Sequence, residues 1–364
     1  MKFIEITAII VYDKAMKTTM KALIWHKNGT TELVEKPIPQ ILDEKDAIVK
    51  VTMSSICTSD LHIIAGAVPK AVPETVLGHE FTGEVVLTGK EVKNLHPGDR
   101  VSVNCETFCG ECFFCKKGYV NNCQNGGWLL GCSIDGCQAE YVRVPYADTG
   151  LTRLPEDVSD ENALFAGDIL PSGWWSAELC EIEADDTIAI IGAGPVGLCA
   201  MQSAKFMGAK RIIAIEPNES RRNLAQKFAD YVIDPQNQDV IAQIKALTNN
   251  RGADKVIEAA GTGETFKMAW QIARPNAIVA IPAMYEAPQT LPLPDMYGKN
   301  LTFKTGGVDA NKCAKLINLI SKKQISTDFL ISERVNFENI QEGYEIFKNQ
   351  KDKCLKIAVD YEKE

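Results

Sequence analysis

Short apolar runs recur along the second half of the chain, separated by segments with the period of an amphipathic helix. The runs occupy residues 187–191, 212–215, 231–233, 255–258, 277–281 and 301–304. Most are separated by helix-period segments at 196–207, 220–228, 240–247 and 265–272. Strands that alternate with helices predict a parallel, doubly wound α/β sheet. Two more helices, at 310–321 and 337–348, and a last strand at 355–360 are predicted beyond it.

The first half has a different pattern, in which short β-rich runs are broken by Gly, Pro and Asp and helical periodicity is scarce. These runs cover residues 20–25, 47–53, 83–87, 100–103 and 139–144. The pattern changes after Pro155, where 160–176 reads as a helix that Pro171 must interrupt or restart. The segment that begins at Met20 resembles the start of a chain, so residues 1–19 before it are predicted to be an N-terminal extension.

Composition narrows the class of protein. The 364 residues are 45% hydrophobic and 24% charged, as in a soluble globular chain of two or three domains. The 39 basic and 48 acidic residues leave a net charge of −9, and basic runs are no longer than pairs, so nucleic acid is not an expected partner. No apolar stretch is long enough to span a membrane. With twelve cysteines and no recognisable signal peptide, we expect a reducing, cytoplasmic compartment.

A glycine-rich motif follows the apolar run 187–191 and opens a helical segment; it reads Gly192-Ala193-Gly194-Pro195-Val196-Gly197. In this context the glycines allow a tight turn, close approach of the backbone to a pyrophosphate, and helix–strand packing. Glu216, nineteen residues after Gly197, ends the next run, where a carboxylate accepts hydrogen bonds from ribose hydroxyls. We therefore predict NAD in preference to NADP, although Arg221 and Arg222 lie close by. The alternative is a turn followed by an ordinary surface glutamate.

Four cysteines within fifteen residues indicate a metal site. Their spacing, two, two and seven intervening residues, suits a closed tetrahedral site for a structural Zn²⁺, formed by Cys109, Cys112, Cys115 and Cys123. An iron–sulfur cluster and four unligated thiols are the alternatives.

A third group of residues is more dispersed. Cys57 follows a β run, and Gly78-His79-Glu80 comes about twenty residues later. A catalytic Zn²⁺ needs three protein ligands and one open position, so Cys57, His79 and a carboxylate would suffice. Taken alone, one cysteine and one histidine in β-rich sequence are more often core residues.

Together these motifs resemble the zinc-dependent medium-chain dehydrogenase/reductase family, which includes alcohol, sorbitol and threonine dehydrogenases. The resemblance runs from Met20 to about Tyr361 and is closest to bacterial secondary-alcohol dehydrogenases. Beyond the glycine turn, Glu216 and the four cysteines, it rests on three motifs: Cys57-x-Ser59-Asp60-x-His62, Gly78-His79-Glu80-x-x-Gly83 and Gly98-Asp99-Arg100-Val101.

The resemblance implies a partly open, GroES-like β-barrel catalytic domain (20–169 and 309–364) with a zinc lobe at about 105–124. A Rossmann NAD-binding domain (170–308) would be inserted between its two parts. Cys57, His79 and Asp168 would hold the catalytic zinc, with Glu80 as an alternate ligand. Ser59 and His62 would relay the proton of the substrate hydroxyl, and Ser172 would touch the nicotinamide.

The implied reaction is hydride transfer between NAD(H) and a secondary or vicinal alcohol or ketone, with two Zn²⁺ per chain, in a homodimer or homotetramer. Polyol, diol and threonine-type dehydrogenases of the same family are alternatives, because small pocket contacts separate such substrates. Two other readings are a zinc-free quinone or enoyl reductase on this fold and a non-catalytic NAD-binding protein.

Overall fold

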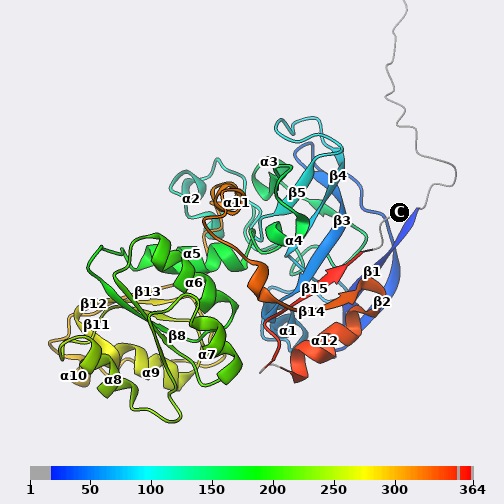
Figure 1. The fold of residues 1–364 in the computed structure, drawn as a ribbon. Helices are drawn as coiled ribbons and strands as arrows, with labels where there is room; N and C mark the ends of the chain where they lie inside the picture. The colour runs from blue at the N-terminus through cyan, green and yellow to red at the C-terminus, as the bar shows by residue number, and fades with distance from the viewer. Residues whose placement is uncertain (1–17, 351–352, 362–364) are drawn as a thin grey trace, which may run out of the picture.

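The computed structural model describes residues 18–350 and 353–361, which form two adjacent halves (Figure 1). One half contains a six-stranded sheet in which every neighbouring pair is parallel, in the order β10-β9-β8-β11-β12-β13. This order is that of a dinucleotide-binding Rossmann sheet, and it confirms the predicted doubly wound sheet. Its strands are β8 (Thr187–Ile191), β9 (Arg211–Ile215), β10 (Tyr231–Ile233), β11 (Ala253–Glu258), β12 (Ala273–Ile281) and β13 (Thr302–Thr305).

Burial on both faces explains why the central strand β8 is almost entirely apolar. In β8, Ile188 and Ile190 pack into one core with α6, while Ala189 and Ile191 pack into another beneath α8 and α9. The helices of this half are α5 (Ile169–Leu179), α6 (Pro195–Phe206), α7 (Glu219–Ala225), α8 (Val240–Leu247), α9 (Gly263–Ile272) and α10 (Leu293–Met296).

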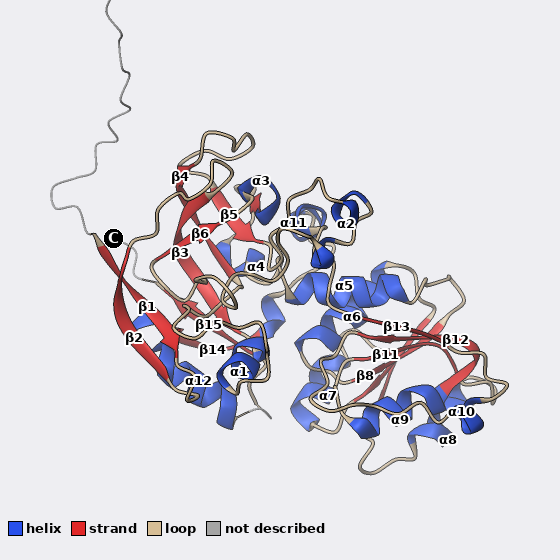
Figure 2. Cartoon of the chain, turned by 180° about the vertical axis from the view of Figure 1, so that it is seen from behind, coloured by secondary structure: helices blue, strands red, loops and turns tan. Residues whose placement is uncertain are grey.

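The other half is built mainly of antiparallel strands (Figure 2). A sheet in the order β14-β15-β3-β4-β5-β7, with β6 beside β3, brings two C-terminal strands next to N-terminal ones, and β1 and β2 form a separate pair. The strands are β1 (Thr19–Trp25), β2 (Thr31–Pro37), β3 (Ala47–Ile56), β4 (Phe81–Thr88), β5 (Arg100–Val103), β6 (Tyr141–Val144), β7 (Leu151–Arg153), β14 (Ile331–Asn336) and β15 (Lys356–Asp360).

Helices in this half are short between residues 20 and 150, as the scarce helical periodicity there predicts, and the helices predicted at 310–321 and 337–348 are present. The helices of this half are α1 (Thr58–Ile64), α2 (Phe113–Lys116), α3 (Ala147–Gly150), α4 (Asp160–Ala163), α11 (Cys313–Ser321) and α12 (Ile340–Asn349), with 3₁₀ turns at Val120–Asn122, Asp328–Leu330 and Phe337–Asn339. The helix predicted at 160–176 is two helices, α4 and α5. Pro171 lies in the first turn of α5, where a missing N–H is tolerated.

A shared apolar core joins the two halves. It includes Phe165, Trp174 of α5, Cys199 of α6 and Leu316 of α11. The predicted domain boundaries fall at the start of α5 and just after β13. Most of the predicted N-terminal extension lies outside the described residues, and Thr19 already belongs to β1. Within the described ranges, no helix has the length and apolar character needed to cross a membrane.

Candidate active site and metal centres

Three separate segments converge on one potential metal centre. Cys57 immediately precedes α1, His79 lies in the loop before β4, and Asp168 immediately precedes α5. Nε2 of His79 is 3.4 Å from Oδ2 of Asp168, Sγ of Cys57 is 3.9 Å from the same oxygen, and the three donor atoms all lie within 4.8 Å of one another. One ion with bonds of about 2.0–2.3 Å fits among such donors. A thiolate, an imidazole and a carboxylate are suitable ligands for Zn²⁺.

Close backbone packing positions Asp168. A Cβ atom on Gly167 would lie 1.6 Å from the carbonyl oxygen of Val103, so only glycine allows this approach. Although Asp168 is the N-cap residue of α5, its side chain does not cap the helix. Its carboxylate faces His79 instead, and the thiol of Cys105 also interacts with it. The side chain of Asp168 is 14% exposed, whereas that of His79 is 3% exposed, so the centre is most open on the Asp168 side.

Substituting Gly167 with alanine should therefore disturb the centre through the backbone. We expect Gly167→Ala to lower the free energy of unfolding by about 1–3 kcal/mol or more, as overpacking does, and to reduce zinc retention. Urea unfolding and metal analysis of the dialysed protein measure the two effects. Gly263→Ala is the control, because Gly263 begins α9 and its new methyl group would meet only the flexible Gln289 side chain. Equal stability and zinc content in both variants would contradict the prediction.

The charges at this centre support one another. Burial disfavours an imidazolium at His79, but Asp168 and Cys57 outweigh that penalty and hold the pKa of His79 well above its ordinary value. Burial likewise works against ionisation of Asp168, yet His79 keeps the pKa of this carboxyl below its usual range. On the opposite side of the ring, Oδ1 of Asp60 is 3.6 Å from Nδ1 of His79. A carboxylate at this place orients a ligating histidine.

Glu80, the predicted alternate ligand, lies outside this group of three. Its Oε2 atom is paired with the ammonium of Lys356 in β15, and Lys356 also donates to the carbonyl of Ile56 at 3.1 Å. Both side chains are almost fully buried. Burial raises the pKa of Glu80 to about 7, although Lys356 opposes the shift. The structure therefore assigns Glu80 to a buried ion pair with a residue 276 positions away.

The predicted relay and nicotinamide residues lie near the centre on two helices. Ser59 and His62 are both in α1, which directly follows β3, so they come after a strand as expected. The Ser59 hydroxyl is 3.6 Å from Sγ of Cys57. His62 lies one turn further along α1, and its Nδ1 atom is 3.6 Å from Glu286, in the segment after β12. Ser172 lies one turn after Asp168 in α5, and its backbone N–H donates to the Asp168 carbonyl at 2.8 Å.

Polar and aromatic residues that were not predicted as site residues surround the centre. The edge of Trp128 meets the ring of His79 at 5.6 Å between centroids, and Lys70 lies over Trp128 at 5.0 Å. Glu106 is buried. Its burial, and to a smaller extent the negative charge of Asp168, raise the pKa of Glu106 to about 8. In the sequence, the only sign of the place of Glu106 is its position just before the four clustered cysteines.

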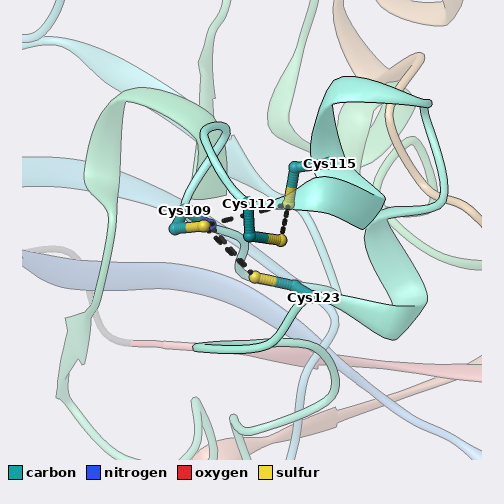
Figure 3. Close-up of side chains that lie close together, drawn as sticks. All are labelled: Cys109, Cys112, Cys115 and Cys123. Carbon is teal, nitrogen blue, oxygen red and sulfur yellow. Dashed lines mark hydrogen bonds between the residues drawn. The ribbon is translucent and has the colours of Figure 1, made fainter.

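The four clustered cysteines form the second potential metal centre (Figure 3). The sulfur atoms of Cys109 and Cys115 are 4.0 Å apart, those of Cys112 and Cys115 are 3.5 Å apart, and those of Cys109 and Cys123 are 3.6 Å apart. A tetrahedron with Zn–S bonds of about 2.3 Å has edges of about 3.8 Å. Hydrogen bonds from the backbone at Cys115 and Gln124 lower the pKa of Cys112 to about 6, which favours a thiolate. The geometry suits one tetrahedral ion rather than a multi-iron cluster.

The cysteine lobe is also attached to the segment that returns from the parallel sheet. The backbone N–H of Asn121 donates to Asp309 at 3.1 Å, and the side chain of Asn311 donates to the carbonyl of Gly118 at 2.8 Å. The lobe therefore contacts the connection between β13 and α11 directly.

The glycine turn lies between β8 and α6, where the strand order of the sheet reverses. Gly192 has a φ of +93°, and a Cβ atom on Gly197 would lie 1.9 Å from the Gly192 carbonyl oxygen, so both positions require glycine. The carboxylate of Glu216 accepts hydrogen bonds from the N–H of Ala193 at 2.7 Å and of Asn218 at 2.9 Å. The turn comprising Gly192, Gly194, Pro195, Val196 and Gly197 thus has the geometry of a pyrophosphate cradle at a helix N-terminus.

Comparisons with known proteins agree with this geometry. Residues 43–156 match the alcohol dehydrogenase GroES-like domain, and residues 195–322 match the zinc-binding dehydrogenase domain. An alcohol dehydrogenase of Cupriavidus necator is 34% identical over 94% of this chain and 99% of its own. The sorbitol dehydrogenase of Bacillus subtilis is 32% identical over 93% of this chain and 97% of its own. An alcohol dehydrogenase structure from Thermus sp. ATN1 has a TM-score of 0.87 and 31% identity, covering 94% of this chain and 100% of that one.

The chain therefore belongs to the zinc-dependent medium-chain alcohol dehydrogenase family. It is an oxidoreductase of the class that acts on alcohols, and the family predicted from the sequence motifs is confirmed.

Proposed function

We propose that the chain is an NAD-dependent enzyme that interconverts a secondary or vicinal alcohol and its ketone, with one catalytic and one structural Zn²⁺. The observation that carries this proposal is the convergence of Cys57, His79 and Asp168 within 4.8 Å. A zinc ion with three protein ligands has one coordination position open for substrate, whereas four cysteines occupy all four positions of their ion. The relatives named above, which include a sorbitol dehydrogenase, support a hydroxylated small molecule as substrate.

Residues of the chain have distinct tasks in this reaction. When bound, Zn²⁺ supplies a Lewis acid that lowers the pKa of a hydroxyl group, and NAD supplies the hydride acceptor. Cys57, His79 and Asp168 hold the ion. Ser59, beside Cys57, would take up the proton of the substrate hydroxyl as it gives up its own, and His62, one turn further along α1, would receive the released proton. Ser172, in α5, would contact the nicotinamide.

Glu216 supports the choice of NAD over NADP. It is buried at the end of β9, where its negative charge opposes a 2′-phosphate. Arg222, which is close enough in sequence to bind such a phosphate, is paired with Asp234 at 3.1 Å and donates to the backbone carbonyl of Glu216 at 3.2 Å. We also expect a cytoplasmic homodimer or homotetramer.

The Glu216→Gln variant should weaken discrimination between the two cofactors. An amide oxygen can still accept from Ala193, but the charge that opposes the 2′-phosphate is lost. We expect the ratio of NADPH to NADH dissociation constants to fall about tenfold, or about 1.4 kcal/mol, by fluorescence titration. Glu219→Gln, at an exposed position of α7, is the control. A parent enzyme that prefers NADPH would contradict the role of Glu216.

One experiment tests the proposed function as a whole. The protein is analysed for metal and then assayed spectrophotometrically with a panel of alcohols, diols, polyols, threonine and ketones, using NAD(H) and NADP(H). We expect about two zinc ions per chain and turnover of a secondary or vicinal alcohol with NAD. One zinc or none, with reduction of quinones or enoyl compounds, would favour a zinc-free reductase. NADH binding without turnover of any panel member would favour a binding protein.

A further inference from the structure

A chain of buried polar side chains extends from the metal centre to the C-terminal helix. Asp60, Gln138 and Tyr344 come from α1, the segment before β6, and α12, so they are distant in sequence. The Tyr344 hydroxyl donates to Oε1 of Gln138 at 2.8 Å, and Nε2 of Gln138 donates to Oδ2 of Asp60 at 3.3 Å. Oδ1 of Asp60 then faces Nδ1 of His79 at 3.6 Å. All four side chains are buried.

The direction of these hydrogen bonds is determined by their chemistry. An ionised carboxylate can only accept, so the amide of Gln138 must present its NH₂ group to Asp60. Its oxygen then faces Tyr344, which supplies a proton. The Tyr344 hydroxyl also interacts with Asp60. Asp60 therefore determines which way the amide of Gln138 points, and Tyr344 supplies the donor that the amide oxygen then needs.

The arrangement leaves one oxygen of Asp60 directed at the histidine. Oδ2 already accepts from Gln138 and from the backbone N–H of Cys57 at 2.9 Å, so these two donors occupy the other oxygen of the carboxylate. Within the described residues, neither Oδ1 of Asp60 nor Nδ1 of His79 has a hydrogen-bond partner, and the two atoms face each other at 3.6 Å. A proton held on Nδ1 leaves the lone pair of Nε2 for a metal.

Packing places Gln138 next to the histidine backbone as well. A Cβ atom on Gly78 would lie 2.7 Å from Cγ of Gln138, and Gly78 directly precedes His79. The backbone N–H of Gln138 donates to the carbonyl of Leu77 at 2.9 Å. Gln138 is thus held against the loop that carries the ligand, and its side chain has little freedom to reorient.

We infer that Tyr344 and Gln138 are positioning residues of the catalytic metal centre, which hold Asp60 so that it orients His79 for zinc. This inference rests on the proposed function, because it requires a metal at Cys57, His79 and Asp168. Loss of the Tyr344 hydroxyl leaves the Gln138 oxygen without its donor and removes one contact to Asp60. Asp60 then orients His79 less well, and zinc binds less tightly.

The test measures zinc affinity in Tyr344→Phe by competition with a chelator, with thermal unfolding as a check on the fold. We expect about tenfold weaker binding at the three-ligand centre, the lower end of the effect of outer-shell partners. The affinity of the four-cysteine centre for zinc should be unchanged. The Cys57→Ala variant lacks the three-ligand centre, so its zinc-release curve identifies the contribution of the four-cysteine centre. Gln138→Met is a second variant that interrupts the same chain and should have the same effect.

The matched control is Tyr361→Phe. Tyr361 is also buried, and its hydroxyl donates to the carbonyl of Cys137 at 2.9 Å and lies 3.1 Å from the Ser54 hydroxyl. It should leave zinc affinity unchanged. In an Asp60→Asn background the effect of Tyr344→Phe should disappear, because it acts through Asp60.

Three results would overturn the inference: unchanged zinc affinity in Tyr344→Phe, an equal loss in Tyr361→Phe, or full additivity with Asp60→Asn. A parent protein that binds only the four-cysteine zinc would instead refute the proposed function. The two failures are therefore distinguishable.

Discussion

Replacing Cys57 with alanine is expected to reduce kcat/KM for alcohol oxidation by about a thousandfold or more. The reason is that a bound metal contributes several kcal/mol to stabilising the developing charge, and each 1.36 kcal/mol corresponds to a factor of ten in rate. Asp168→Asn, which exchanges a carboxylate ligand for a neutral amide, should have an effect in the same direction. Steady-state kinetics and metal analysis measure the change, and we expect zinc to fall from two ions per chain to one in Cys57→Ala.

The control for this prediction is Cys180→Ala. Cys180 is a buried thiol at the end of α5 and belongs to neither potential metal group, so its removal should spare both zinc and activity. NADH binding should survive in all three variants, because the glycine turn is unaltered. Substantial activity in Cys57→Ala would contradict the assignment of the centre.

The second large effect is expected on stability. Lys356→Met leaves Glu80 buried without its cationic partner, and removing one member of a buried ion pair costs about 3–5 kcal/mol. Since burial already raises the pKa of Glu80 to about 7, the unpaired carboxyl binds its proton more tightly in the folded chain than in the unfolded one. The stability deficit should therefore grow as the pH rises above the unfolded-state pKa and shrink toward acid pH.

Urea unfolding of Lys356→Met at several pH values measures this deficit. The double variant Glu80→Gln/Lys356→Met should recover part of the lost stability, because the remaining side chain is neutral. If the loss in free energy of unfolding in the double variant equalled the sum of the losses in Glu80→Gln and Lys356→Met, the ion pair would not be the cause.

The parallel strands could be predicted almost residue by residue. β8 and β10 coincide with the predicted runs at 187–191 and 231–233. β8 is buried along its whole length and is almost entirely apolar, which makes such a strand easy to recognise. β2 and β14 were not predicted, since both are partly exposed and carry charged residues among their apolar ones. α1 was also missed, because seven residues are too few to display a helical period.

The chemistry could be predicted where ligands are close in sequence. Four cysteines within fifteen residues indicate a metal site by spacing alone, whereas Asp168 was placed only through resemblance to a family. Lys356 and Tyr344 could not be assigned from the sequence. A lysine or tyrosine that will be buried beside a distant acid has the same local pattern as one on the surface, and only the fold pairs it with Glu80 or Asp60.

The pairing of β15 with β3 has a consequence for how the chain is made. The antiparallel sheet gains a strand, and Glu80 gains Lys356, only from residues near the C-terminus. During synthesis the parallel sheet, which is continuous in sequence from β8 to β13, can therefore form before the antiparallel one is complete. A nascent chain on a ribosome stalled before codon 356 would therefore contain the folded dinucleotide-binding sheet but would lack the last strand of the antiparallel sheet.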